Sequence, residues 1–191
     1  MPTTETPKIL LVDDELSIVR ALTRALKQAF PGALQIESCN SGADALELMH
    51  GRRFDVIISD LRMPGMGGME LLERAARLQP DCVRMILTGT SDFGTAQQAL
   101  NGFGVYRYLT KPWETDDLVT HVGAAVKHGQ LVCEQREQAL AWAASKGQAS
   151  PQDIERQRLE SMEPGITMVE WDADGCLVLP ELDDKGPGFS F

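Results

Sequence analysis

The sequence has few of the residues that build metal or thiol redox centres. Its four cysteines are scattered and form no C-x-x-C pair, which excludes the common zinc and disulfide-exchange motifs. We therefore expect reduced thiols that are mostly buried. The three histidines lie far apart in the sequence, and their spacing does not indicate that they converge on one site. These residues are Cys39, Cys82, Cys133, Cys176, His50, His121 and His128.

Positive charge and long apolar runs are also scarce. The 18 lysines and arginines are outnumbered by 28 aspartates and glutamates, so the net charge is -10. An acidic chain is a poor partner for nucleic acid or for an anionic membrane surface. No segment approaches the ~20 apolar residues of a membrane-spanning helix, and the start, MPTTETP, lacks the basic and apolar parts of a signal peptide. We expect a cytoplasmic protein whose partners are neither nucleic acid nor membrane.

What the sequence does have is a regular alternation of short apolar runs and amphipathic stretches. Apolar strands joined by helices predict a parallel sheet covered on both faces, which is a doubly wound α/β fold. In such folds the functional site lies beyond the carboxyl ends of the strands. We expect strands at 8–12, 33–39, 54–59, 83–88 and 105–110, and helices at 15–30, 41–50, 67–79, 92–102 and 115–130, the last able to continue to about residue 145.

Local signals support two of these helices. In the helix at 15–30, four apolar residues recur on one face, which predicts a buried side. The helix at 41–50 has Ser41 at its N-cap position, with Asp44 three residues later. The four residues of the apolar face are Ile18, Leu22, Ala25 and Leu26.

The C-terminal part has a different character. A small, polar break at 145–151 precedes a short helix with Ser150 at its N-cap and Pro151 at its first position. Residues 166–179 then predict a β-hairpin that turns at 172–175, and the acidic, Gly/Pro-rich end is typical of a mobile tail. We therefore divide the chain into four parts: 1–128, a folded domain; 129–149, a helical linker; 150–180, a short helix and hairpin; and 181–191, the tail.

Charged and polar residues follow four of the expected strands. The first strand, in KILLVDDE, runs directly into Asp13 and Asp14, and the third ends at Asp60. Thr88 is the last residue of the fourth strand, in LTGT, and Lys111 follows the fifth, in YLTKPW. Because the carboxyl ends of parallel strands meet at one edge of a sheet, we expect these side chains to converge.

Three carboxylates in one crevice require a compensating proton or cation. Two like charges about 4 Å apart repel by roughly 4 kcal/mol at an effective dielectric near 20. Mg2+ prefers such hard oxygen ligands and usually binds one or two carboxylates with water and phosphate oxygens. A metal, a lysine and a hydroxyl around one carboxylate are what phosphoryl transfer requires. The carboxylate itself can then act as the nucleophile and form an acyl phosphate.

Four motifs, LVDDE, DLRMPGMGG, LTGT and YLTKPW, occur in the order and spacing of a known family. Residues 8 to about 128 resemble the receiver domain of two-component response regulators. The resemblance implies a flavodoxin-like fold with the strand order 2-1-3-4-5, and a histidine kinase or phosphotransfer protein as phosphodonor. The stretch GVYRYLTKPW is most similar to receivers attached to cyclic-di-GMP phosphodiesterases of the HD-GYP type or to kinase-linked regulators, here with a short non-catalytic extension.

The resemblance also implies a role for individual residues. Asp60 would be the phospho-acceptor. Mg2+ would be held by Asp13, Asp14 and Asp60 and by the backbone carbonyl of Arg62, with Asp14 binding directly and Asp13 through water.

On the other side of the implied site, Thr88 and Lys111 would grip the phosphoryl group. Tyr108 matches the aromatic that moves inward when the threonine binds phosphate in many receivers. An ordinary core aromatic is the alternative for this residue. The bond between Lys111 and Pro112 is expected to be cis.

Two other functions fit part of this pattern. Haloacid-dehalogenase-type phosphatases also combine an aspartate nucleophile, a lysine, a hydroxyl residue and Mg2+, but they place the nucleophile after the first strand in a D-x-D motif. Here Asp13 is followed two residues later by Glu15. A degenerate receiver that acts only as a scaffold is the other alternative. A nucleotide-binding P-loop is not indicated, because MPGMGG lacks the terminal lysine and serine or threonine.

The last long helix has more apolar positions than one sheet can cover. Packing on the sheet explains the first three, but the later ones lie beyond the usual end of a receiver. These later positions need a partner, which is either the tail hairpin or a second chain. Alternatively, Gly129 ends the helix. The apolar positions are Leu118, Val122, Ala125, Val132 and Leu140.

Overall fold

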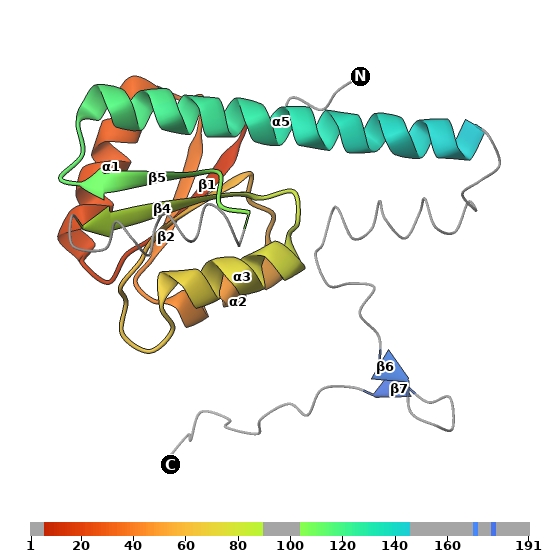
Figure 1. Ribbon diagram of the computed structural model, residues 1–191, viewed down its shortest axis with the longest axis horizontal. Helices are drawn as coiled ribbons and strands as arrows, with labels where there is room; N and C mark the ends of the chain where they lie inside the picture. Colours follow the sequence, from red (N-terminus) through yellow and green to blue (C-terminus); the bar gives the residue numbers. More distant parts are fainter. Residues whose placement is uncertain (1–5, 90–103, 146–169, 172–176, 179–191) are drawn as a thin grey trace, which may run out of the picture.

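The computed structural model describes residues 6–89, 104–145, 170–171 and 177–178. Five parallel strands form one sheet in the order β2-β1-β3-β4-β5 (Figure 1). This confirms the expected doubly wound, flavodoxin-like architecture. The strands are β1 (Lys8–Val12), β2 (Gln35–Cys39), β3 (Val56–Asp60), β4 (Val83–Gly89) and β5 (Arg107–Lys111).

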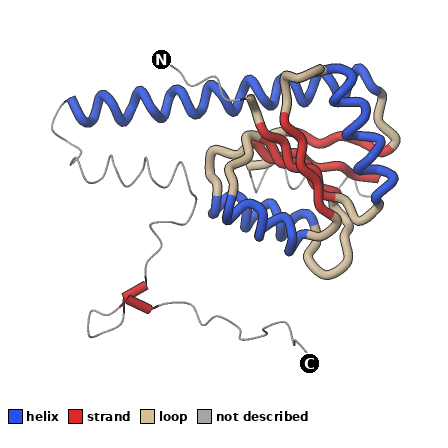
Figure 2. The backbone as a smooth tube through the Cα atoms, turned by 180° about the vertical axis from the view of Figure 1, so that it is seen from behind, coloured by secondary structure: helices blue, strands red, loops and turns tan. Residues whose placement is uncertain are grey.

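Helices cover both faces of the sheet, with α1 and α5 on one side and α2 and α3 on the other (Figure 2). Alternation along β1 explains the two layers, because successive side chains of a strand point to opposite faces. Ile9 and Leu11 belong to the core under α1 and α5, whereas Leu10 and Val12 belong to the core under α2 and α3. The helices are α1 (Leu16–Ala29), α2 (Gly42–Gly51), α3 (Gly68–Leu78) and α5 (Thr115–Ser145).

Both local helix predictions are confirmed. On α1, Leu22 and Leu26 are buried, and Ile18 and Ala25 pack against the same core. At the start of α2, the Ser41 hydroxyl accepts a hydrogen bond of 3.1 Å from the backbone N–H of Asp44. The cap satisfies one of the backbone donors that a helix start leaves unpaired.

The extension is described only in part. α5 passes through Gly129 without a break and continues to Ser145, so the alternative that Gly129 ends the helix is wrong. β6 (Glu170–Trp171) pairs antiparallel with β7 (Leu177–Val178), as expected for the hairpin. The helices expected at 92–102 and near 151–162 lie outside the described residues. Within the described ranges, no helix is both long and apolar enough to cross a membrane.

Candidate functional site

The residues expected at the strand ends lie at one edge of the sheet. Asp13 follows the last residue of β1, and Asp60 and Lys111 are the last residues of β3 and β5. The central strands bring these ends together, because β3 pairs with both β1 and β4, and β4 pairs with β5. Thr88, near the end of β4, stands opposite Thr110 of β5.

A lysine supplies the cation that the carboxylates require. The Lys111 ammonium nitrogen lies 2.6 Å from Asp13 Oδ2 and 2.5 Å from Asp60 Oδ1. The two acidic residues are buried, at 1% and 6% exposure, so their charges receive little solvation. Asp14, in contrast, is exposed. The sequence predicted a compensating proton or cation, and in this structure the Lys111 ammonium contacts both buried carboxylates.

The second oxygen of each buried carboxylate accepts a hydrogen bond from a backbone N–H group. Asp13 Oδ1 accepts a hydrogen bond of 2.9 Å from the N–H of Glu15, and Asp60 Oδ2 accepts one of 2.8 Å from the N–H of Arg62. In both cases the donor lies two residues further along the chain, in the turn that leaves the strand. Each carboxylate is therefore held in a defined orientation, because one oxygen binds a backbone N–H and the other contacts the Lys111 ammonium group.

The electrostatics of the site reflect its burial. Burial raises the pKa of the Asp13 carboxyl above its ordinary value, against the opposing effect of the Lys111 hydrogen bond. For Lys111, burial acts to lower the pKa, but the hydrogen bonds and charges of Asp13 and Asp60 outweigh it and raise the pKa above its ordinary value. Lys111 is therefore a firmly charged cation at neutral pH.

Two glycines bring the neighbouring helices against the loop that follows Asp60. A Cβ atom on Gly68, at the start of α3, would lie 1.9 Å from the backbone oxygen of Asp60, and one on Gly42, at the start of α2, would lie 3.0 Å from the Met66 side chain. Gly65 turns the loop with a φ of +74°, which glycine adopts without strain. From the sequence alone, MPGMGG served only as part of a family motif and was rejected as a P-loop. Its packing role was missed, although the paired glycines were an available signal for it.

The remaining expected residues occupy more varied positions. Thr88 is buried, and its hydroxyl donates to the carbonyl of Gly89 at 3.1 Å. Tyr108 is half-buried against the core beneath α2 and α3. The Lys111–Pro112 peptide bond is cis, which confirms that expectation.

In the described part of the chain, no three His, Cys, Asp or Glu side chains are gathered closely enough to form a ready metal site. The chemistry of the donor set still fits Mg2+, since Asp13 and Asp60 offer hard carboxylate oxygens and Asp14 adjoins them in the chain. The raised pKa of Asp13 shows that one lysine does not fully offset its burial. A dication in the same place would favour the ionised carboxylate more strongly.

The fold and the site together define a doubly wound α/β domain with a buried aspartate paired to a lysine. Residues 9–123 match the response regulator receiver domain family, and the chain belongs to that family. Receiver domains are signalling phospho-acceptors of two-component systems rather than classical enzymes, and they typically use Mg2+. This membership displaces the phosphatase alternative.

Several characterised proteins share this domain. The chain is 37% identical over 139 residues to the hydrogenase transcriptional regulatory protein HoxA of Bradyrhizobium diazoefficiens, covering 73% of this chain and 28% of HoxA. It is 30% identical over 159 residues to the transcriptional regulatory protein FixJ of the same organism, covering 83% of this chain and 75% of FixJ. It spans about a quarter to a third of HoxA and of the C4-dicarboxylate regulator DctD.

A solved structure shows the same fold. The signal receiver domain of an HD domain-containing protein from Pseudomonas fluorescens Pf-5 superposes with a TM-score of 0.64 at 32% sequence identity. The match covers 70% of this chain and 96% of that one. The similarity lies in the receiver fold and leaves the remainder of this chain without a counterpart there.

Proposed function

We propose that this chain is a phospho-accepting response regulator in which Asp60 receives a phosphoryl group from a histidine kinase or a phosphotransfer protein. The observation that carries the proposal is the placement of Asp60. Its carboxylate is buried at the end of a central strand, oriented by the Arg62 N–H and contacted by the Lys111 ammonium. A carboxylate fixed in this way is a positioned nucleophile.

The transfer step is a displacement at phosphorus. An Asp60 oxygen forms the new O–P bond while the P–N bond of the phosphohistidine breaks, and the electron pair stays on the imidazole nitrogen, which takes a proton from solvent. Lys111 offsets the negative charge that spreads over the phosphoryl oxygens. The Thr88 hydroxyl is a donor on the neighbouring strand, and in the proposal it turns from Gly89 to a phosphoryl oxygen.

Asp13, Asp14 and Asp60, with the backbone carbonyl of Arg62, would hold Mg2+. When bound, the ion supplies further neutralisation of phosphoryl charge. The burial of Asp13 and Asp60 supports this assignment, because buried carboxylates without a full counter-charge gain from a cation. Asp14 is exposed and would contribute from the rim of the site.

Incubation with acetyl phosphate and Mg2+ tests the acceptor. The full chain should gain the mass of one phosphoryl group, labile to base and to hydroxylamine, and Asp60→Asn should gain none. Asp55→Asn is the matched control, because Asp55 precedes β3 at the opposite edge of the sheet, where it accepts from the Lys8 N–H. Equal labelling of Asp60→Asn and wild type would refute the assignment, and an unlabelled wild type would favour the scaffold alternative.

The proposed output is a change at the surface around β5 and α5 that a protein partner or a second copy of the chain recognises. Phosphorylation would draw Thr88 towards the phosphoryl group and let Tyr108 move inward. Two large apolar side chains on the later part of α5, Leu131 and Trp142, are 55% and 59% exposed. Eleven residues apart, they share one face of a helix, which suits self-association.

Sedimentation of the full chain with and without a phosphoryl mimic tests this output. Phosphorylation should tighten a dimer, and the double variant Leu131→Gln, Trp142→Gln should lose much of that tightening. Each tenfold change in the dimer constant corresponds to about 1.4 kcal/mol. Identical association of all samples would point to a different downstream protein.

The pathway is part of the proposal as well. The resemblance of GVYRYLTKPW to HD-GYP-linked receivers has one supporting observation, the receiver of an HD domain-containing protein among the structural relatives. HoxA and FixJ are named as transcriptional regulators, but the net charge of -10 favours a protein rather than DNA as the direct partner of this chain. The proposed location of the chain is the cytoplasm, where it would meet the histidine kinase or phosphotransfer protein that supplies the phosphoryl group.

A further inference from the structure

At the edge of the sheet opposite to Asp60, the long helix α5 meets the rest of the domain a second time. Its first turns are held by apolar side chains, among them Leu118 and Val122, which are fully buried. Gly129 is also buried, and a Cβ at this position would lie 3.2 Å from the Val83 side chain and 3.4 Å from the Asp55 carbonyl. The helix therefore passes close to the starts of β3 and β4, where glycine leaves room.

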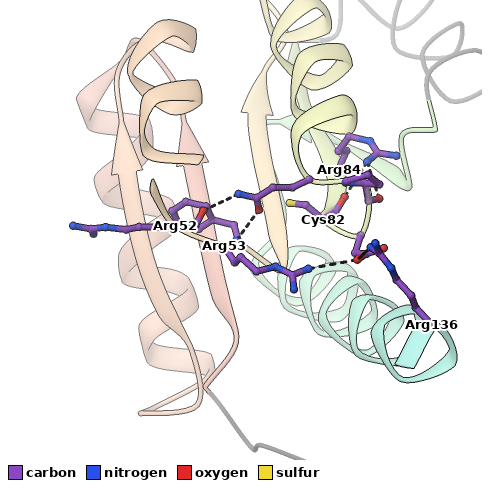
Figure 3. Close-up of polar contacts among 9 residues, drawn as sticks. Arg52, Arg53, Cys82, Arg84 and Arg136 are labelled. Carbon is purple, nitrogen blue, oxygen red and sulfur yellow. Dashed lines mark hydrogen bonds and ion pairs between the residues drawn. The ribbon is translucent and has the colours of Figure 1, made fainter. Parts of the chain in front are cut away.

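Two turns further along, a charged contact follows. The Arg136 guanidinium pairs with Asp81 Oδ2, and the Arg53 guanidinium lies 3.4 Å from the same oxygen. Figure 3 shows Arg53 and Arg136 pointing to one carboxylate from different elements, the segment before β3 and the helix α5. The Asp81 side chain is only 13% exposed, whereas that of Arg136 is 42% exposed.

The loop that carries Asp81 is firmly held. Gln79, at 4% exposure, accepts a hydrogen bond from the Phe54 N–H and donates to the carbonyls of Met49 and Arg52. At the other end of the loop, Arg84 donates to carbonyls at Cys82 and Gly104. Asp81 is thus a largely buried acceptor on a fixed loop, and it has a cationic partner on each side.

We propose that Asp81 is a latch for the α5 extension: it holds Arg136 against the base of the receiver, so that residues 129–136 belong to the folded body of the domain. The helix would then leave the folded body of the domain after Arg136 rather than at residue 129. The latch would set the position of the exposed Leu131 relative to the sheet, and it does not depend on phosphorylation of Asp60.

The energetic case rests on burial. An ion pair between two exposed side chains adds little stability, but a hydrogen bond to a charged group that is largely withdrawn from water, as Asp81 is, contributes more. With Arg53 and Arg136 on one carboxylate, removing Arg136 leaves Asp81 with a single cation at 3.4 Å. The contact joins residues 55 positions apart in the sequence, so it ties the later part of α5 to the loop that precedes β4.

Hydrogen exchange of the full, unphosphorylated chain tests the latch. In the wild type, amide protection along α5 should extend to about residue 137 and fall beyond it. In Arg136→Gln and in Asp81→Asn, the amides of 130–137 should exchange about fivefold to tenfold faster. The double variant should match the faster of the two single variants, since residues in one contact are not additive.

Arg52→Gln is the control. It removes an ion pair of 2.6 Å with Glu37 on the same end of the domain, but this pair involves no residue of α5. Its exchange at 130–137 should equal that of the wild type. The proposal is overturned if protection already falls at residue 129 in the wild type, if Asp81→Asn leaves 130–137 unchanged, or if the effects of the two single variants simply add.

Discussion

Replacing Lys111 by methionine tests how the site balances its charge. Methionine keeps an unbranched apolar stem and removes the ammonium group that lies 2.6 Å from Asp13 and 2.5 Å from Asp60. Without metal, the two buried carboxylates would then face each other with their lysine counter-charge removed. We expect Lys111→Met to be less stable than the wild type at neutral pH.

The geometry gives the magnitude. The two carboxylate oxygens are at most about 5 Å apart, because each lies within 2.6 Å of the same nitrogen. Two negative charges at that separation repel by about 3 kcal/mol at an effective dielectric near 20. For a chain of this length, such a loss lowers the melting temperature by about 10 °C. Proton uptake by one carboxyl relieves part of the repulsion, so the measured loss is smaller than the full repulsion between two charged groups.

Thermal and urea unfolding at two pH values make the assay specific. Burial already raises the pKa of the Asp13 carboxyl in the folded protein, and loss of the Lys111 counter-charge raises it further. The variant should therefore regain stability as the pH falls towards 4, where Asp13 takes up a proton. In the wild type, Lys111 keeps its charge at neutral pH because its pKa is raised above 10.5. Its ion pairs are lost only as the pH rises beyond that value.

Lys111→Arg is the matched control, because it retains the cation and should keep most of the stability. Millimolar Mg2+ should also stabilise Lys111→Met more than the wild type, since the metal no longer competes with the ammonium group. The charge-balance reasoning fails if Lys111→Met unfolds like the wild type at both pH values in the absence of metal.

Three further changes test the site and its supports. Burial raises the pKa of Asp13 above 3.8, so the stability that comes from its protonated form is full below that pH and is lost as the pH rises; Asp13→Asn should remove this loss and most of the Mg2+ response in melting experiments. Gln79→Leu should lower the free energy of unfolding by about 3 kcal/mol or more in urea titrations, because three backbone groups lose their partner. Gly68→Ala should cost about 2 kcal/mol and slow phosphorylation by acetyl phosphate, because its Cβ would displace the backbone at Asp60; an unchanged labelling rate would contradict the positioning role.

Much of this protein follows from the local pattern of its sequence. β3 is buried along its whole length and reads as an apolar run, and the α1 helix shows its buried face in the spacing of Leu22 and Leu26. Both signals are local, because strand and helix periodicity depend only on neighbouring residues. The polar residues at the strand ends follow from the same pattern, since a parallel sheet aligns its carboxyl ends. The motif resemblance added the assignment of roles within that set.

The tertiary structure decided which side chains of the site contact one another, because those contacts depend on distances between separate strands. The sequence placed Lys111 at the right edge of the sheet but did not show that its ammonium would lie between Asp13 and Asp60 while Asp14 stayed exposed. That arrangement depends on the reach of one flexible side chain across three strands, which no local pattern encodes.

The extension of α5 shows the same division. Helical spacing predicted that the helix could continue, but Gly129 also allowed it to end. The helix continues where Gly129 fits against Val83 and Arg136 meets Asp81. A glycine costs a helix about 1 kcal/mol relative to alanine. Packing against Val83 and a charged contact with a distant loop offset that cost, so the continuation of α5 past Gly129 was decided by the folded domain rather than by the residues of the helix alone.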